Sequence, residues 1–372
     1  MLYNIQFLRF AAAMLVVLYH CAARLPANDS VFQGLFSAGE AIGFAGVDIF
    51  FVISGFIMAH TTTHHHGAAN GIDFAKRRLA RIFSGYWPFF ILATVVFGYF
   101  RPDHFAESNL LKSFFLWPQQ LNFVLLEITW TLSFELYFYL LFSLLILLFN
   151  LRHRYRIVLV STLLLLVYNL YHHFIAHSFS PEKFYYLSFW SQFLTSPFLL
   201  EFFSGALLAW RLTKKPTGFA LSWFLAGCAL FLAAGWVNEF YYSGLIEQGF
   251  HTLPRVFLYG APACMIVAGL VRMEVQGFHA PRRFSAATGG ASYAIYLSHI
   301  LILTLVWNTG FNQLVSTWSS NRMVAAYALL MLFILGFSVA HYIFLEKPLH
   351  QLFKRWAGLS SSSYPQKKPI AR

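Results

Sequence analysis

Ten long apolar stretches, separated by short polar connections, run along the whole chain. A helix that crosses the hydrocarbon core of a membrane needs about 20 mostly apolar residues, and nearly all of these stretches approach or reach that length. They cover residues 5–24, 40–59, 85–100, 129–149, 157–175, 194–210, 219–237, 253–271, 287–310 and 323–345. The third stretch is the shortest. This pattern predicts an all-α integral membrane protein with about ten transmembrane helices.

The composition agrees with a membrane protein. Hydrophobic residues make up 58% and charged residues 11% of the 372 residues, whereas soluble domains contain about 25% charged residues. No soluble domain is visible in the polar connections, so we expect the chemistry to lie in the membrane or at its faces. We expect one transmembrane domain over residues 1–349. Over residues 350–372 we expect a cytoplasmic tail that is basic, rich in serine and disordered.

The distribution of Lys and Arg predicts the topology, because cytoplasmic loops carry an excess of positive charge. With both termini in the cytoplasm, nineteen of these side chains fall in inner segments. Only six fall on the outer side, namely Arg24, Arg101, Lys112, Lys183, Arg255 and Arg322. The net charge of +12 is scattered over short loops, which indicates topology and anionic membrane lipid as a partner and no nucleic acid.

Neither a metal site nor a disulfide framework is indicated. Cys21, Cys228 and Cys264 each fall inside a predicted span without paired spacing. The run His64-His65-His66 has no carboxylate or cysteine partners nearby in the sequence and is interpreted as a solvated loop. The N-terminus has neither the basic region nor the cleavage site of a signal peptide, so we expect the first helix to be retained.

Four ionisable residues lie within the apolar stretches, Arg9, Asp48, Glu135 and Glu201. Each such group costs about 2.5–3.5 kcal/mol on insertion scales, so we expect them to face a shared polar cavity. The alternative is a set of structural ion pairs, for example between Arg9 and Asp48.

Arg9 and His20 lie eleven residues apart in the first span. At about 100° per residue this is within about 20° of three full turns, so both side chains project from one helix face about 16 Å apart. His20 lies toward the outer end, and a neutral imidazole can take a proton from a hydroxyl near neutral pH. A lone membrane histidine is, however, more often a hydrogen-bonded packing residue.

In the second span, Gly39, Gly43 and Gly46 predict close approach of another helix. Asp48 would then be held against that helix, where it could orient His20 or Arg9.

Two further segments carry polar groups near the ends of spans. Arg78 and Arg81, at i and i+3 in the inner loop, suit phosphate binding, although they also fit ordinary positive-inside charge. Glu135 should lie at a depth similar to that of His20, because it follows the start of the fourth span by a few residues.

As a group, these residues resemble the acyltransferase 3 family. The motifs that carry the resemblance are Arg9 and His20 with ten residues between them, Gly43 to Phe56 ending in Ser54-Gly55-Phe56, Arg78 and Arg81 before Tyr86-Trp87, Trp130 to Glu135, Ser292-Tyr293 to His299, and Glu346-Lys347-Pro348. They cover the first 140 residues and about 284–350. The segment between them contributes little beyond topology.

The resemblance implies a mostly bacterial membrane enzyme that moves short acyl groups from a cytoplasmic coenzyme A thioester to hydroxyls of surface or exported glycans. It implies that His20 is catalytic, with Arg9 as its companion and Arg78 and Arg81 as the donor-binding pair. The chain departs from the pattern at Ser84, where proline is expected. It also lacks the extracytoplasmic hydrolase-like domain of some members, so we expect it to act alone or with a separate partner. Its length and the opening Ile5-Gln6-Phe7-Leu8-Arg9 look most like members that modify exopolysaccharide.

The sequence therefore predicts an O-acetyltransferase of the bacterial inner membrane that uses acetyl-CoA and no metal, with a polysaccharide or lipid-linked glycan as acceptor. His20 would act as general base or be acylated transiently, with Glu135 and Asp48 orienting it or binding the sugar. A proton-coupled transporter, a lipid-linked sugar flippase and a scaffold for a polysaccharide synthase are the alternatives. The absence of an internal repeat weakens the transporter hypothesis, because many transporters are built from repeated halves. A homodimer, or association with polysaccharide synthesis machinery, is left open.

Overall fold

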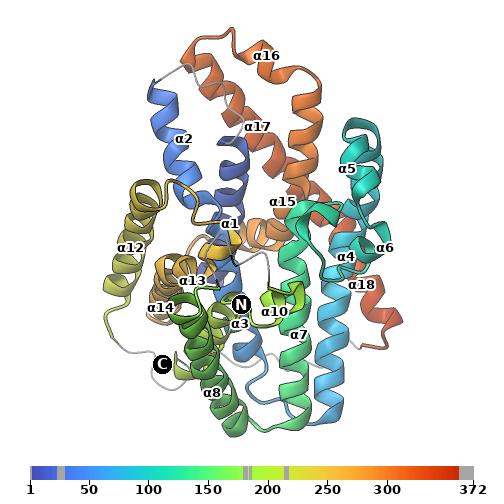
Figure 1. The fold of residues 1–372 in the computed structure, drawn as a ribbon. Coiled ribbons are helices and arrows are strands. Elements are labelled where there is room, and N and C mark those ends of the chain that lie inside the picture. Colours follow the sequence, from blue (N-terminus) through green and yellow to red (C-terminus); the bar gives the residue numbers. More distant parts are fainter. Residues whose placement is uncertain (1, 23–29, 179–182, 184–186, 213–217, 360–372) are drawn as a thin grey trace.

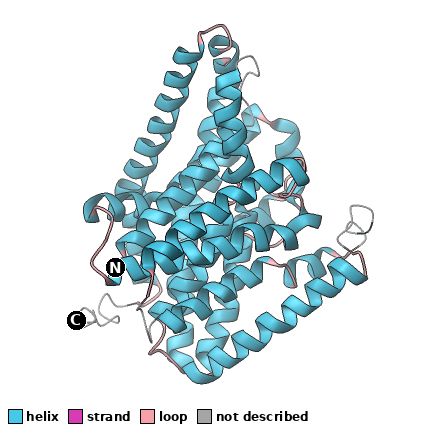
Figure 2. Cartoon of the chain, turned by 90° about the vertical axis from the view of Figure 1, so that its left-hand side faces the viewer, coloured by secondary structure: helices cyan, strands magenta, loops and turns pink. Residues whose placement is uncertain are grey.

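The computed structural model describes residues 2–22, 30–178, 183, 187–212 and 218–359. Within these residues every regular element is helical, as Figure 2 shows. Ten helical segments of the described chain are long and apolar enough to cross a membrane. The prediction of an all-α membrane protein with about ten spans is thus confirmed.

Eleven helices form the body of the bundle. They are α1 (Tyr3–Ala22), α2 (Ser30–Gly43), α3 (Gly46–Thr61), α4 (Ala68–Phe100), α7 (Trp130–Leu148), α8 (Leu151–Leu170), α11 (Phe198–Leu212), α12 (Ala220–Tyr241), α14 (Ala261–Val275), α15 (Arg282–Asn308) and α17 (Ser320–His341). In Figure 1, α1 and α3 lie near the middle, with α12 and α14 toward one side and α4 and α7 toward the other. The first helix is therefore well placed to line an internal site.

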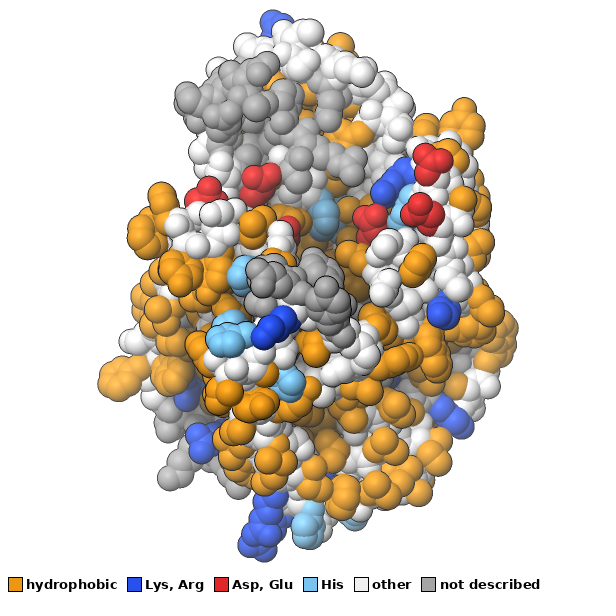
Figure 3. All heavy atoms as spheres, viewed as in Figure 1, with side chains coloured by type: hydrophobic (Ala, Val, Ile, Leu, Met, Phe, Trp, Pro, Cys, Tyr) orange, Lys and Arg blue, Asp and Glu red, His pale blue; other side chains and the backbone are white. Residues whose placement is uncertain are grey.

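Shorter helices complete the connections. They are α5 (Pro102–Glu107), α6 (Leu110–Phe114), α10 (Phe189–Leu194), α13 (Thr252–Arg255), α16 (Phe311–Val315) and α18 (Lys347–Trp356). Three π-helical turns, at Tyr171–Ile175, Val256–Gly260 and Tyr342–Glu346, extend α8 and join α13 to α14 and α17 to α18. Apolar side chains spread over much of the face in Figure 3, and acidic side chains gather in its upper half.

The third span differs from its prediction, since it belongs to the 33-residue helix α4 and is not short. Arg78 and Arg81 lie in this same helix and not in a loop before it. The helix continues through Ser84, whose hydroxyl donates a hydrogen bond to the Arg81 carbonyl. Serine in place of the expected proline is therefore accommodated by an uninterrupted helix.

Glycines set the distance between the central helices. A Cβ at Gly43 would collide with the backbone carbonyl of Leu15, and one at Gly46 with that of Ala12, both in α1. This confirms the close approach predicted from the glycine spacing. The predicted second span is broken at this point, since α2 ends at Gly43 and α3 begins at Gly46.

The expected boundary between residues 349 and 350 falls inside α18. This helix continues beyond the boundary because it packs against α4, with the Phe353 and Trp87 rings 5.6 Å apart. Residues 360–372, which contain most of the expected tail, lie outside the described residues.

Candidate active site

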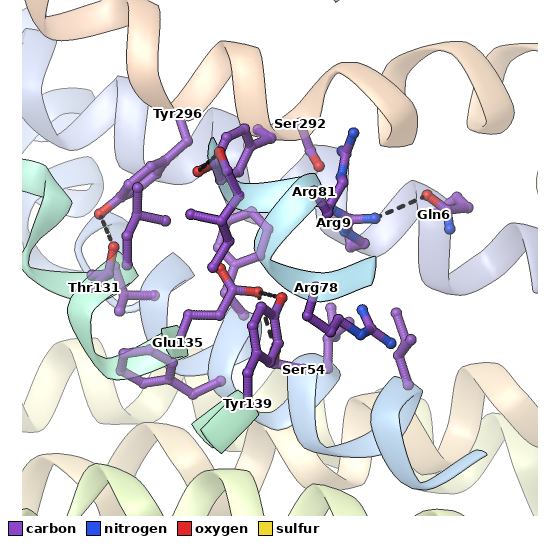
Figure 4. A pocket seen from close by; sticks show the side chains of 18 residues that line it. Gln6, Arg9, Ser54, Arg78, Arg81, Thr131, Glu135, Tyr139, Ser292 and Tyr296 are labelled. Atoms are coloured by element: carbon purple, nitrogen blue, oxygen red, sulfur yellow. Dashed lines mark hydrogen bonds between the residues drawn. The ribbon is translucent and has the colours of Figure 1, made fainter. Parts of the chain in front are cut away.

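Two cavities lie along α1. The first, here called the Arg9 cavity, has a volume of about 210 Å³. Its polar lining comes from α1, α3, α4, α7 and α15 and consists of Gln6, Arg9, Ser54, Arg78, Arg81, Thr131, Glu135, Tyr139, Ser292, Tyr293 and Tyr296. Figure 4 shows most of these side chains gathered around one space. The predicted grouping of Arg9 with Arg78 and Arg81 is thus present in the structure.

The second cavity, here called the His20 cavity, has a volume of about 620 Å³. Its polar lining includes Tyr19, His20, Gln119, Glu127, Ser133, Gln192, Glu247, Gln248, Thr252 and Arg255. Aromatic rings line it as well, namely Phe44, Trp130, Phe134, Phe189, Phe193, Phe198 and Tyr296. Such a mixture of ring faces and hydrogen-bonding groups suits a ligand with both apolar and hydroxyl-bearing surfaces.

Val47 and Tyr296 line both cavities. The Tyr296 hydroxyl donates a hydrogen bond to the carbonyl of Ile128 at 2.9 Å and accepts one from the Thr131 hydroxyl at 3.0 Å. These bonds to the start of α7 fix the ring as a wall between the two spaces. Arg9 and His20, from one helix, lie on opposite sides of this wall.

Three guanidinium groups line the Arg9 cavity, and they differ in the contacts that they make with the rest of the protein. Arg81 forms an ion pair of 2.5 Å with Glu346, which is fully buried. Arg78 lies over the rings of Phe74 and Tyr139, at 5.2 and 5.4 Å. The hydrogen bond of Arg9 within the described residues is a long one, 3.5 Å to the side-chain oxygen of Gln6. An anion with several oxygens would satisfy donors that the protein leaves available.

Glu135 lies in the Arg9 cavity and does not line the His20 cavity. Its carboxylate accepts hydrogen bonds from the hydroxyls of Ser54, at 3.4 Å, and Tyr139. The expectation that Glu135 accompanies His20 is therefore wrong, because Glu135 lines the Arg9 cavity, whereas Trp130, Ser133 and Phe134 of the same helix line the His20 cavity.

Asp48 is not among the residues that line either of the two cavities. Its carboxylate is fully buried and binds the guanidinium of Arg255, with an Nη2–Oδ2 distance of 2.6 Å. Glu201 is also buried nearby, with Gly260 against its carboxylate. The expected single cavity for all four buried ionisable groups is wrong, since helix packing divides them into Arg9 with Glu135 and Asp48 with Glu201. Arg255, counted above as an outer charge, is buried in this second group.

The His20 ring contacts a second histidine. Its Nδ1 lies 2.9 Å from the Val16 carbonyl and 3.2 Å from Nε2 of His299 on α15. His299 is fully buried. The two motifs that contain these histidines, 279 residues apart in the sequence, thus meet in the structure.

The remaining motif residues either line the Arg9 cavity or pack outside it. Ser54 and Tyr293 line the Arg9 cavity, and the Tyr293 hydroxyl donates a hydrogen bond of 3.2 Å to the Ile82 carbonyl. Phe56 is buried and stacks on His60. Gly55 provides close packing, because a Cβ there would collide with the carbonyl of Phe202 in α11. Gly55 and Phe56 therefore support the site without lining it.

Sequence reasoning missed Tyr139, Arg255 and Tyr296 as lining residues. Tyr139 could have been found, since it lies one helical turn after Glu135. Tyr296 lies within the Ser292 to His299 motif. No signal along the sequence singled out Arg255, because its partner Asp48 is 207 residues away.

No group of three His, Cys, Asp or Glu side chains that could hold a metal occurs among the residues described. In the run His64-His65-His66, burial and the neighbouring His64 and Arg154 lower the pKa of His65. The carbonyl of His65 accepts a hydrogen bond from Arg154. This loop is thus tied to the start of α8.

Comparison with known proteins identifies the family of this chain. Residues 2–343 match a family model described as an acyltransferase domain, Acyl_transf_3. The chain belongs to the acyltransferase 3 family. This protein is therefore a membrane acyltransferase, and the part of the chain that the structure describes includes ten helical segments long enough to span a bilayer.

Among curated proteins, this acyltransferase is similar to the exopolysaccharide production protein ExoZ of Rhizobium meliloti (strain 1021). The two are 28% identical over 337 residues, which cover 85% of this chain and 94% of the relative. No solved structure gives a significant match.

Proposed function

We propose that this acyltransferase is an O-acetyltransferase that moves the acetyl group of cytoplasmic acetyl-CoA to a hydroxyl of an exported or surface polysaccharide, or of its lipid-linked precursor. The observation that carries the proposal is that α1 presents Arg9 to one cavity and His20 to another, with Tyr296 between them. A transferase acting across a membrane needs such an arrangement, with separate donor and acceptor spaces that meet.

The Arg9 cavity suits the donor. Its arginines match the phosphates of coenzyme A in charge and in hydrogen-bonding geometry. A volume of about 210 Å³ is below the ~300–1,000 Å³ of pockets that enclose whole ligands. The cavity would therefore hold the part of the donor that leads to the thioester, while the nucleotide stays at the cytoplasmic face.

The His20 cavity suits the acceptor. Sugar rings pair an apolar face with a rim of hydroxyls, and the cavity offers Trp130 and phenylalanine rings beside the side chains of Gln119, Gln192 and Glu247. The name of the relative, an exopolysaccharide production protein, supports a polysaccharide acceptor. Arg255, held by Asp48, would contribute a hydrogen-bond donor to the same space.

The transfer itself requires one proton to move twice. His20 takes the proton of the acceptor hydroxyl, whose oxygen then attacks the thioester carbonyl and forms the new C–O bond. The C–S bond breaks, and the proton passes from His20 to the departing thiolate, which leaves as the thiol. If His20 is acylated first, the same ring nitrogen attacks the thioester carbonyl, and the C–S bond breaks as the thiolate departs. In a second step the acceptor oxygen attacks the acyl group, the C–N bond to His20 breaks, and the hydroxyl proton passes to the thiolate.

The other polar residues of the Arg9 cavity would hold the donor site in shape. Glu135, bonded to Ser54 and Tyr139, sets the local charge next to the arginines. We place the basic loops, and with them the Arg9 cavity, on the cytoplasmic side of the bacterial inner membrane. The excess of Lys and Arg in these segments supports this orientation.

The test is acyl transfer by purified protein in lipid nanodiscs, with radiolabelled acetyl-CoA and unacetylated exopolysaccharide from a strain that lacks the gene. We expect labelled ester in the polymer with the unaltered protein and none with His20→Ala. His279→Ala should behave as the unaltered protein, because this exposed histidine lies outside both cavities.

The alternative functions give different results in the same membranes. Proton-coupled solute uptake without acyl transfer would favour a transporter. Full acetylation of the polymer in cells that contain His20→Ala at normal levels would contradict the proposed role of His20. A scaffold would retain acetylation when Arg78 and Arg81 are both replaced by alanine.

A further inference from the structure

The contact between His20 and His299 defines which nitrogen of each ring carries a hydrogen. The two rings come from α1 and α15, with centroids 5.0 Å apart, and Nδ1 of His20 lies 3.2 Å from Nε2 of His299. A nitrogen–nitrogen contact of this kind is a hydrogen bond only if one nitrogen carries a hydrogen and the other a lone pair. The surrounding carbonyl groups decide between the two arrangements.

The His299 ring is neutral with its hydrogen on Nδ1. It is fully buried, and no carboxylate bonds to it among the described residues, so a charged ring would be costly. Its Nδ1 lies 3.2 Å from the carbonyl of Ile295, one turn earlier in α15. Because a carbonyl only accepts hydrogen bonds, Nδ1 must donate, and Nε2 holds the lone pair.

The same argument applies to His20. Its Nδ1 lies 2.9 Å from the Val16 carbonyl, which again requires a hydrogen on Nδ1. That hydrogen also faces the lone pair of His299 Nε2, so it is shared between two acceptors. In the neutral ring, the lone pair is then on Nε2 of His20.

The fold keeps both rings in this arrangement. Around the histidines, Ala13, Val17 and Cys21 of α1 belong to one buried cluster with Ile295 and Leu303 of α15. Next to His299, the Ser298 hydroxyl bonds to that of Ser338 in α17 at 2.9 Å. Rotation of His299 away from His20 would disturb a fully packed interface.

We propose that His299 is a positioning residue that holds His20 in the tautomer with its lone pair on Nε2 and stabilises the imidazolium formed when that nitrogen takes the acceptor proton. The inference rests on the proposed function, in which His20 accepts this proton. His299 neither gains nor loses a proton in the reaction, since its Nε2 remains an acceptor throughout. Its part is comparable to that of the buried carboxylate behind the histidine of a serine protease, but without a charge.

The inference predicts a change in turnover and not in donor binding. Replacing His299 by leucine removes the acceptor at Nε2, and we expect kcat to fall about 10–100-fold, less than the ~10²–10⁴-fold that general acid–base catalysis contributes as a whole. The KM for acetyl-CoA should stay within about twofold, because His299 does not line the Arg9 cavity. His299→Gln, whose side-chain oxygen can accept the same hydrogen, should recover a large part of the lost rate.

The experiment measures initial rates of thiol release from acetyl-CoA with unacetylated exopolysaccharide as acceptor, for purified His299→Leu, His299→Gln, His20→Ala and the His20→Ala/His299→Leu double variant. His341→Gln is the matched control, since this half-buried histidine of α17 packs against Phe89 away from both cavities. Thermal unfolding and acetyl-CoA binding are measured for every variant. The double variant should be no slower than His20→Ala, because two residues that act as one unit are not additive.

The outcomes separate this inference from the proposed function. Activity retained by His20→Ala would contradict the proposed role of His20 itself. If His20→Ala is inactive while His299→Leu turns over at the normal rate, only the positioning role is overturned. A raised KM for acetyl-CoA with unchanged kcat in His299→Leu would make His299 a binding residue, and this result would also overturn the positioning role. Should His299→Leu fail to fold, the Gln variant decides, since a folded Gln variant as slow as His20→Ala contradicts the inference.

Discussion

Asp48 and Arg255 form an ion pair in which the carboxylate of one buried residue accepts hydrogen bonds from both Nε and Nη2 of the other, at 3.0 and 2.6 Å. The Arg255 guanidinium also lies over the rings of Phe44 and Phe198, at 4.8 and 5.2 Å. The pair ties α3 to the start of the helical segment that leads into α14. It also places a cationic side chain in the wall of the His20 cavity.

Breaking this pair should destabilise the protein strongly. We expect Asp48→Ala to lower the free energy of unfolding by about 3–5 kcal/mol, since it leaves a buried guanidinium without its carboxylate. Chemical denaturation in detergent micelles measures this change. The double variant Asp48→Leu/Arg255→Met should recover much of the stability and yet transfer acyl groups poorly. A double variant as unstable as Asp48→Ala would show that the pair is not the cause.

Gly55 should not tolerate even one methyl group. In Gly55→Ala the new Cβ meets the carbonyl of Phe202 in α11, and overpacking of this kind costs about 1–3 kcal/mol. Gly336→Ala is the matched control, because a Cβ at this helical glycine meets no atom within 4 Å. It should be neutral or stabilise the protein by up to about 1 kcal/mol. Equal melting temperatures for the two variants would contradict the close packing of α3 and α11.

Replacing Arg78 and replacing Arg81 by alanine should have different effects on stability, although both should weaken acetyl-CoA binding. Arg78→Ala should raise the KM for acetyl-CoA about tenfold with little change in melting temperature, because Arg78 contacts ring faces and has no ion pair among the described residues. Arg81→Ala should raise the KM and also lower the melting temperature, since it leaves the buried Glu346 unpaired. Arg77→Ala, from the same helix but outside the lining of the Arg9 cavity, serves as control. Identical kinetics for Arg77→Ala and Arg78→Ala would contradict a donor site here.

Tyr296 should keep the donor and acceptor spaces apart. In Tyr296→Ala the wall side chain is removed, so water from the His20 cavity should reach the thioester. We expect hydrolysis of acetyl-CoA without any acceptor to rise several-fold. Tyr296→Phe keeps the ring and loses only the hydrogen bonds to Ile128 and Thr131. We therefore expect this variant to hydrolyse little acetyl-CoA without an acceptor. Liquid chromatography of free coenzyme A measures both rates of hydrolysis. An unchanged rate of hydrolysis in the alanine variant would contradict the role of Tyr296 as a barrier between the two cavities.

Much of the fold followed from local patterns. Apolar length predicted the spans, and the glycine spacing predicted the close approach of another helix, because both depend on short segments of sequence. That this helix is α1 is visible only in the structure. The register of Arg9 and His20 predicted that both side chains project from one face of the first helix. It could not show that they line two different cavities, with Tyr296 of α15 in the lining of both, since that depends on how distant helices pack.

The buried charges show the same limit. That Asp48, Glu135 and Glu201 need polar surroundings follows from the energy of placing a charge in hydrocarbon. Which partner each receives does not, because Arg255 and Ser54 come from remote segments. The sequence by itself therefore determined the membrane architecture, the family motifs and the residues able to do chemistry. Only the tertiary structure decided that Glu135 joins Arg9, that Asp48 holds Arg255 and that His299 meets His20, because side-chain pairing is fixed by contacts between helices far apart in the chain.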